Sequence, residues 1–266
     1  MLVRIFTLLL TLILVGAAPS RAQDQPASPA PSPINTDRPA FTNSSVVVPT
    51  GSFQAENGFL ATGNLGQTVV DAPETLVRFG LTKRTEFRFT VPDYFDNVTT
   101  GAGWGFGDLA LGVKQQLGPL HKFDLSLIAF VSIPTGANGV SSGGYDPGLQ
   151  APWSRALSAN WTAAGMFSVY WPTYQSPEGR ARNVTGETTF LFDRQLTKPW
   201  DAFVEYAGDF PEVGGTRHVL HFGTAFKVAN DQQVDFHVGF GLSAAAVDHI
   251  VGVGYSFRFQ AIRSKE

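Results

Sequence analysis

Long stretches of this chain alternate between apolar and polar residues with a period of two. This is the period of a β-strand whose two faces meet different surroundings. In the stretch Phe123 to Ile133, the odd positions are Phe, Leu, Leu, Ala, Val and Ile. In the stretch Val234 to Leu242, every even position is Val, Phe or Leu. No window of comparable length keeps the 3.6-residue period of a helix, so the sequence predicts an all-β fold.

Twelve strands are expected from this alternation. Most of them run for 10 to 13 residues, about twice the mean strand length of soluble proteins, whereas transmembrane β-strands need about 9 to 11 residues. The sixth is the least regular because Pro152 cannot donate a ladder hydrogen bond. The expected ranges are 52–62, 73–82, 84–92, 106–118, 123–134, 148–157, 159–172, 184–196, 200–209, 217–228, 232–243 and 249–260.

The links between these strands alternate in length. Strand pairs 2–3, 4–5, 6–7, 8–9 and 10–11 are joined by short links, such as Lys83 alone or Thr197 to Pro199. Pairs 1–2, 3–4, 5–6 and 7–8 are expected to have longer links, such as Pro134 to Asp146 and Pro172 to Asn183. Outer-membrane barrels combine short turns at one end with long loops at the other and have an even number of strands.

A sheet can span a bilayer only if it is closed, because every backbone polar group in lipid must be paired. The apolar positions are then expected to face lipid and the polar positions the lumen. Aromatic residues near the strand ends suit the two interfacial girdles of such a barrel. The alternative is aromatic core packing in a soluble barrel. The predicted fold is therefore a transmembrane, antiparallel, up-and-down β-barrel of about 12 strands. The girdle candidates are Trp153, Trp161, Tyr170, Trp171, Tyr174 and Trp200.

The ends of the chain differ from this central region. Residues 1–22 read as a cleaved signal peptide, with Arg4 before an apolar run and small residues at the expected cleavage site; a membrane anchor is the alternative. Residues 23–50 form a Pro-rich lead-in whose later part is a possible lumen plug. Residues 51–260 form the expected barrel, and residues 261–266 form a C-terminal tail after the last aromatic. Because outer-membrane barrels usually end on that aromatic, we expect recognition by the assembly machinery to use an internal signal.

Composition excludes several classes of function. The chain has no cysteine, which removes disulfides, thiolate metal sites and cysteine nucleophiles. It has 19 basic and 22 acidic residues with no basic block, which argues against a nucleic-acid partner. His218 and His221 are three residues apart, so on a strand they point to opposite faces and cannot form a metal pair. We therefore predict neither a metal nor a cofactor.

The polar positions of the expected strands supply the candidate lumen-lining residues. As a functional set they would be a selectivity lining; alternatively, they are ion pairs that fill and rigidify a narrow lumen. Asp37 and Arg38 of the lead-in are candidates for pairing with them from within a plug. The lumen-lining candidates are Glu56, Arg78, Glu86, Arg88, Asp108, Lys114, Asp124, Glu187, Asp193, Glu205, Lys227, Asp235, His237 and Arg258.

An enzymatic role is the less favoured alternative. Some twelve-stranded outer-membrane barrels are lipases, which need Ser, His and a carboxylate or amide in hydrogen-bond reach. The chain has no Gly-x-Ser-x-Gly motif. His237 beside Asp235 is the one suggestive pair, and it is expected to be a hydrogen-bond partner in the lumen. We predict that the protein is not an enzyme.

Several short motifs resemble one family of outer-membrane β-barrels, the "transporter" family named for a meta-pathway of phenol degradation. They include Asn35 to Pro39 ahead of the first strand and Gly51 to Gly58 within it. Further along are Gly107 to Lys114 and Ser132 to Gly136. The resemblance covers most of the chain after residue 22. It implies an exported, channel-like barrel, with small aromatic or hydrophobic compounds as the candidate solutes.

The sequence therefore predicts a channel or transporter in a Gram-negative-type outer membrane, with the lipid bilayer, a small-molecule solute and the assembly machinery as partners. The alternative is a non-conducting barrel whose loops or lead-in have a structural or adhesive role. No oligomeric state is predicted.

Overall fold

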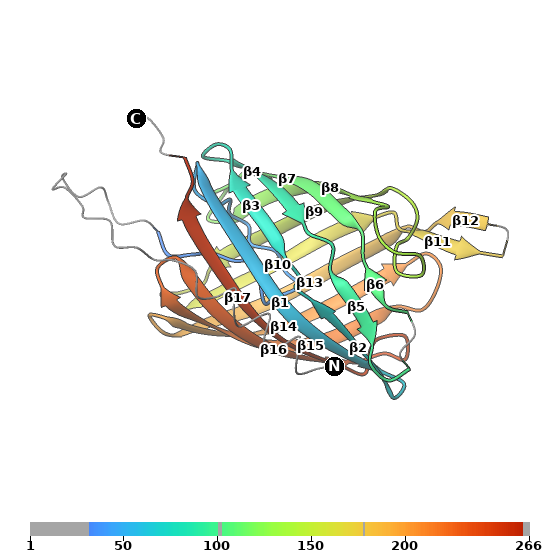
Figure 1. The fold of residues 1–266 in the computed structure, drawn as a ribbon. Helices are drawn as coiled ribbons and strands as arrows, with labels where there is room; N and C mark the ends of the chain where they lie inside the picture. The colour runs from blue at the N-terminus through green and yellow to red at the C-terminus, as the bar shows by residue number, and fades with distance from the viewer. Residues whose placement is uncertain (1–31, 101–102, 178, 263–266) are drawn as a thin grey trace, which may run out of the picture. The chain divides into compact units, whose positions relative to one another are not determined.

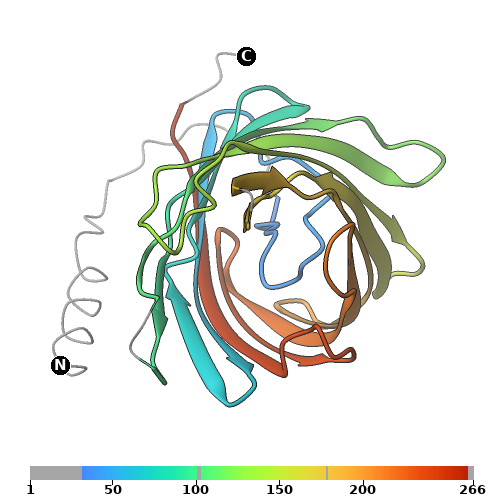
Figure 2. The ribbon, with the colours of Figure 1, turned by 90° about the vertical axis from the view of Figure 1, so that its right-hand side faces the viewer.

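The computed structural model describes residues 32–100, 103–177 and 179–262, and the signal-peptide prediction for residues 1–22 lies outside them. Within the described part the regular elements are β-strands, and none of it is a helix long and apolar enough to cross a membrane. Twelve strands pair in sequence order into one antiparallel ring (Figures 1 and 2). The expected fold class is thus confirmed.

The strands of the ring are 5 to 13 residues long. β1 and β17 close it by pairing from Ser52 opposite Gln260 to Gly63 opposite His249. The ring consists of β1 (Ser52–Asn64), β3 (Leu76–Gly80), β4 (Thr85–Thr90), β7 (Leu109–Gln116), β8 (Asp124–Ile133), β9 (Asp146–Ala156), β10 (Trp161–Tyr170), β13 (Thr185–Thr197), β14 (Trp200–Pro211), β15 (Arg217–Ala229), β16 (Gln232–Gly241) and β17 (His249–Gln260).

Three further strands extend this wall at the end that carries the long loops. β2 (Gln67–Ala72) continues β3, β5 (Tyr94–Asn97) continues β4, and β6 (Gly105–Phe106) continues β7. A separate hairpin, β11 (Thr173–Ser176) with β12 (Gly179–Arg182), lies within the link that follows β10 (Figure 1).

Two expectations about the first strands are wrong. The second strand begins at Gln67 rather than at residue 73, so a two-residue turn, Leu65-Gly66, replaces the expected long link after β1. The strand is also interrupted between Ala72 and Leu76, where Leu60 pairs with Asp71 but Glu56 pairs with Leu76. Four steps on β1 thus oppose five on its neighbour, which is a β-bulge. Along the chain the bulge moves the inward face from odd positions on β2 to even positions on β3, and alternation alone does not anticipate this shift.

Pro152 lies inside β9 and is opposite Met166 of β10. The β8–β9 ladder pairs Leu125 with Trp153 and resumes at Ile128 with Gln150. The interruption between these pairs falls beside Pro152, where the missing N–H could not have donated. A mid-strand proline is therefore accommodated by a local break in one ladder.

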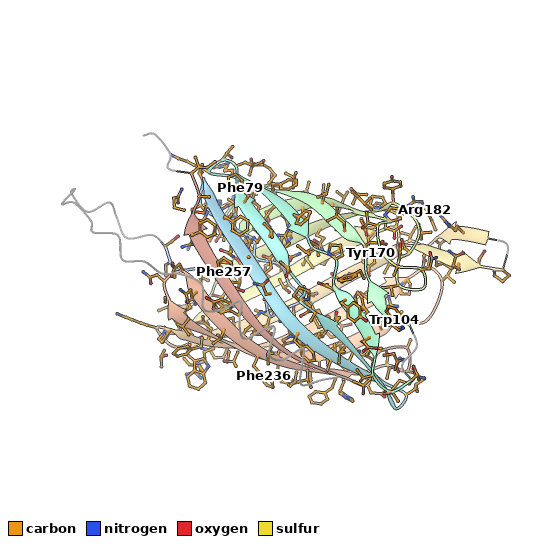
Figure 3. The ribbon with its side chains drawn as sticks, in the orientation of Figure 1. Phe79, Trp104, Tyr170, Arg182, Phe236 and Phe257 are labelled. Atoms are coloured by element: carbon orange, nitrogen blue, oxygen red, sulfur yellow. The ribbon has the colours of Figure 1, made fainter. Side chains whose placement is uncertain are left out.

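The two faces of the wall are opposite in polarity to those of a soluble barrel. Phe167, Phe192 and Phe236 are about half exposed on the outer face, and Figure 3 shows Phe236 pointing away from the wall. Fully buried side chains on the other face include Arg78, Lys114 and Glu205. An apolar exterior around a polar interior is the arrangement of a membrane barrel.

Aromatic residues lie on both rims of this apolar exterior. Trp161 begins β10 and Trp200 begins β14 at the end of the short turns, and Phe210 lies near the end of β14 at the other rim. The expected girdle residue Tyr170 instead lies on the lumen face of β10, two residues after Ser168, and its hydroxyl donates to Asp209. The guanidinium of Arg194 lies 5.3 Å from the ring centroid of Trp161. Amphipathic rings and cations at this level suit the boundary between hydrocarbon and water.

Candidate functional site

Residues 33–50, which we call the inner segment, lie within the ring of strands (Figure 2). The backbone N–H of Val48 donates to Glu86 of β4 at 2.8 Å, and the N–H groups of Asp37 and Arg38 both donate to Glu56 of β1. Ile34 and Val48 are 2% exposed. The inner segment is therefore held by side chains of the wall through its backbone as well as its side chains.

The first anchor of the inner segment is Asp37, which lies among three cations. Arg78 is 3.2 Å and Lys114 is 3.4 Å from its Oδ1, and Arg88 contacts its Oδ2. The strands bring these cations together because Arg78 of β3 is directly opposite Arg88 of β4, which is next to β7. Like charges opposite each other on a sheet repel, so the trio requires anions.

Two wall carboxylates complete this first anchor. Glu86 is 2.9 Å from Nε of Arg78 and 3.5 Å from Nζ of Lys114, and Glu56 is 2.9 Å from Nη1 of Arg78. Three carboxylates thus face three cations, and Arg78, Lys114, Glu56 and Glu86 are fully buried. Removing one member of such a buried network leaves an uncompensated charge, which is strongly destabilising.

The protonation of Asp37 follows from these neighbours. Burial alone would raise its pKa, but the positive charges of Arg78, Arg88 and Lys114 outweigh burial and hold the pKa well below its usual range. The stabilisation from the ionised group is therefore present above the ordinary Asp pKa of about 4. It is lost only as the pH falls through the depressed value of the folded state.

The second anchor is Glu205 of β14, whose carboxylate accepts four hydrogen bonds. The backbone N–H groups of Phe41 and Thr42 donate to it at 2.9 and 2.7 Å, and the Thr42 hydroxyl donates at 2.6 Å. The fourth partner is Nδ1 of His221 at 2.8 Å, and Nε2 of His221 lies 2.9 Å from Nδ1 of His237. The middle of the inner segment is thereby tied to the far side of the barrel from the first anchor.

The third anchor is Arg38, whose guanidinium lies between two wall carboxylates. Its Nη1 is 2.6 Å from Glu74 and its Nη2 is 3.4 Å from Asp235. Gly58 of β1 is directly opposite Gly254 of β17, and a Cβ at either position would overlap the Arg38 side chain. This pair of glycines therefore provides the slot in which the guanidinium lies.

The inner segment leaves one side of the lumen open. A cavity of about 400 Å³, here called the segment cavity, lies between it and the wall formed by β8 to β16. Small side chains such as Ser154, Ala164 and Ala225 line it, with Leu191 and Phe203 beside them. The predicted lumen residues Asp124, Asp193 and Lys227 also line this cavity.

A second cavity of about 440 Å³, here called the loop cavity, lies toward the long loops. Val69, Phe95, Asp93 and the predicted lumen residue Asp108 are among its lining residues. Asp108 accepts hydrogen bonds from the backbone N–H groups of Gly136 and Ser142, which fixes the loop over it. The two cavities share no lining residue among those described.

The remaining predicted lumen residues take no part in the three anchors. Glu187 accepts a hydrogen bond from Ser168 at 3.0 Å, and Arg258 points toward the carbonyl of Pro33 near the start of the inner segment. No group of three or more His, Asp or Glu side chains in the described ranges is arranged to hold a metal ion.

Three residues whose side chains take part in the anchors escaped the sequence analysis: Thr42, which lies in the segment without a periodic pattern, His221 and Glu74. His221 was treated only as an unsuitable partner for His218, although it lies six residues before the expected inward Lys227 and therefore on the same face. Glu74 lies inside the bulge of the second strand, where alternation gives no direction for a side chain. The sequence contained the signal for His221 but none for Glu74.

Comparison with known families places this arrangement in context. A family model described as "Putative MetA-pathway of phenol degradation" matches residues 36–259, which is most of the chain. The chain belongs to this family. Membership confirms the resemblance carried by its short motifs, and the match begins within the inner segment. Among proteins of curated function, no sequence match reaches significance.

Solved structures of outer-membrane barrels share the fold of this family member. The outer membrane channel COG4313 from Pseudomonas putida F1 is 13% identical, with a TM-score of 0.63 over 81% of this chain and 98% of that one. The NanC porin is 8% identical, with a TM-score of 0.58 over 77% and 98%. The KdgM porin in complex with disordered oligogalacturonate is 8% identical, with a TM-score of 0.54 over 78% of this chain and 99% of that one. At these identities the likeness is one of fold.

Proposed function

We propose that this protein is a channel for small solutes in the outer membrane. The observation that carries the proposal is that the inner segment fills the lumen only in part. The first anchor fixes it against β1, β3, β4 and β7 and the second anchor reaches across to β14, while the segment cavity remains between it and the wall formed by β8 to β16. A segment with a purely structural role would be most stable if it packed against the whole wall, because unfilled space loses dispersion contacts.

The solutes are small, and the candidate class is aromatic or hydrophobic. Cavities of about 400 and 440 Å³ fall at the low end of the range for small-molecule sites. Leu191 and Phe203 in the segment cavity and Val69 and Phe95 in the loop cavity give each an apolar side. The description of the family, which concerns phenol degradation, agrees with this class.

In this proposal the inner segment is a partial plug that narrows a continuous path. The solute enters among the long loops, passes the layer of Arg38, Asp235 and Glu205, and leaves through the segment cavity. The short turns and both chain ends then lie on the periplasmic side, as in other barrels with short periplasmic turns. The protein acts by passive passage rather than by catalysis, and the barrel is inserted by the assembly machinery of the outer membrane.

Planar-bilayer recording of the purified full-length protein tests this proposal. Stable single-channel steps in symmetric KCl are expected. Silence from protein that gives the heat-modifiable band of a folded barrel would refute the channel. It would favour the non-conducting, structural alternative.

A further inference from the structure

The charges of the lumen are separated into a concealed set and an accessible set. The cations Arg78 and Lys114 are fully buried and Arg88 is 8% exposed, and all three lie against carboxylates of the first anchor. The inner segment covers them, with the carbonyl of Ser44 accepting from Lys114 and that of Val46 accepting from Arg78. A solute that passes beside the segment therefore does not contact these three cations.

The accessible set is dominated by carboxylates. Six of the residues that line the two cavities are carboxylates and two are cations, and one of the six carboxylates, Asp37, belongs to the first anchor. Both cations are paired, Arg38 with Glu74 and Asp235, and Lys227 with Asp201 at 2.6 Å. Asp93 and Asp108 in the loop cavity, and Asp124 and Asp193 in the segment cavity, have no ion-pair partner among the described residues.

We infer that the open path through this barrel selects cations over anions, and that its organic solutes carry a positive charge beside a small apolar group. The inference rests on the proposed channel function and adds the charge of the solute to it. The four carboxylates without a cation lie in both cavities, so a permeating ion meets negative charge at each end of the path.

The physical reason is the focusing of an electrostatic field in a narrow space with low-dielectric walls. A lumen lined by one sign of charge concentrates counter-ions and repels co-ions. The excess of negative charge along the path is not apparent when all inward charges are counted, because that count includes the three cations that the inner segment covers. The accessible charges alone determine what a solute meets.

Solute chemistry follows from the neighbours of these carboxylates. In the segment cavity Asp193 lies with Leu191 and Phe203, and in the loop cavity Asp93 lies with Val69 and Phe95. A carboxylate beside an apolar surface complements an organic ammonium group attached to a small hydrophobic body. An aromatic carboxylate or sulfonate of the same size would meet repulsion in both cavities.

The test measures reversal potentials of single channels formed by the full-length protein. A KCl gradient at about pH 8, well above the ordinary pKa of Asp, gives the ratio of K⁺ to Cl⁻ permeability. Benzyltrimethylammonium and benzenesulfonate, which have similar size and permanent opposite charges, then replace K⁺ and Cl⁻ in turn. We expect the cation of each pair to be the more permeant, by on the order of threefold to tenfold.

Two variants connect the selectivity to the cavities. Asp193→Asn and Asp124→Asn should each lower the cation-to-anion ratio, by about twofold to fivefold at the Coulomb strength of a water-filled site. Glu212→Gln is the matched control, because Glu212 is exposed and lines neither cavity. It removes the same charge and should leave the ratio unchanged.

The outcomes separate the inference from the proposed function. Channels with equal or anion-favouring permeability would overturn the inference and leave the channel proposal standing. A ratio that falls equally in Glu212→Gln and Asp193→Asn would also overturn it, because the lumen carboxylates would then not be its source. Silent wild-type protein would remove the channel and the inference together.

Discussion

The carboxylate of Asp37 and the guanidinium of Arg78 lie 3.2 Å apart inside the barrel, although Asp37 precedes the first strand and Arg78 belongs to the wall. Arg88 and Lys114 contact the same carboxylate. One acidic side chain of the inner segment thus compensates part of the charge of three strands, and the position of the segment and the electrostatics of the lumen depend on each other.

Asp37→Asn should loosen the inner segment at neutral pH. Three buried cations would then face only Glu56 and Glu86, and breaking a buried ion pair costs about 3–5 kcal/mol. The temperature at which the folded band is lost in heat-modifiability gels should fall, and conductance should fluctuate between a smaller and a larger level. Glu212→Gln, at an exposed position outside both cavities, is the control and should behave as wild type. A single steady conductance level together with wild-type thermal stability in Asp37→Asn would contradict this account.

Deletion of residues 34–45 should widen the channel without preventing assembly. Deletion removes Asp37, Arg38 and Thr42 and hence all three anchors, while the twelve wall strands retain their ladders. Single-channel conductance should rise roughly twofold or more, because the bore of a barrel is set by its strand number. The exposed Arg78, Arg88 and Lys114 should also move the reversal potential toward that of an anion-permeable pore. An unchanged conductance in folded deletion protein would refute the plug.

Gly254→Ala should displace the Arg38 guanidinium from its position beside Gly58 and Gly254. The new Cβ would overlap the guanidinium and the Asp235 carboxylate, and overpacking of this kind costs about 1–3 kcal/mol. The midpoint of denaturant unfolding should fall. Gly186→Ala is the matched control, because a Cβ at Gly186 of β13 meets open space. Equal shifts of the unfolding midpoint in the two variants would mean that the absence of a Cβ beside Arg38 makes no specific contribution to stability.

Glu205→Ala should detach the middle of the inner segment from β14. Four hydrogen bonds to one carboxylate are lost, and hydrogen bonds to charged groups contribute about 1.5–3 kcal/mol each before relaxation. Thr42→Val removes one of these bonds and should cost about 1 kcal/mol. Thr188→Val is the control, since its hydroxyl has no hydrogen-bond partner in the described part of the chain. Unfolding midpoints should therefore rank Glu205→Ala lowest, and any other order would contradict the assignment.

Leu127→Arg should destabilise the inserted barrel by about 2–4 kcal/mol, because Leu127 lies mid-strand on the exposed apolar face of β8. Cysteine labelling checks the register independently. Leu127→Cys should react with a lipid-soluble maleimide, and Asp124→Cys, whose side chain lines the segment cavity, should react with a water-soluble one. Identical labelling of the two positions would refute the assignment of faces.

The sequence was sufficient for most of the wall because lipid imposes a strict two-residue period on each strand. From β8 onward, the expected strand limits agree with the structure to within about two residues, with the usual uncertainty at strand ends. The strands before β8 were harder to place because the chain leaves the regular strand at Pro73 and at Gly107, and the bulge at Pro73 shifts which residues face inward. The hairpin β11–β12 was also missed, since four-residue strands carry too little periodicity.

The candidate site could be predicted only as a set of residue types. Alternation gives the inward direction of Arg78 or Glu205, but it gives no information on which pairs lie at the same height. That depends on the register between neighbouring strands and on the path of the inner segment, which has no periodic pattern. The pairing of Arg38 with Glu74 combines both difficulties, because one residue lies in the segment and the other in a bulge.

From the closure of the ring between β1 and β17 we expect the inner segment to speed folding. That pair joins the two ends of the sheet and carries the largest loop-closure entropy in the molecule. The segment binds Arg78 and Lys114 in the early half of the chain and Glu205 and Asp235 in the late half. Before β1 and β17 pair, the inner segment can therefore bind both halves of the unclosed sheet at once and bring its two edge strands close to each other. Refolding into detergent, followed by the gel shift, should be slower for the 34–45 deletion, and an equal rate would show that the strands close without the inner segment.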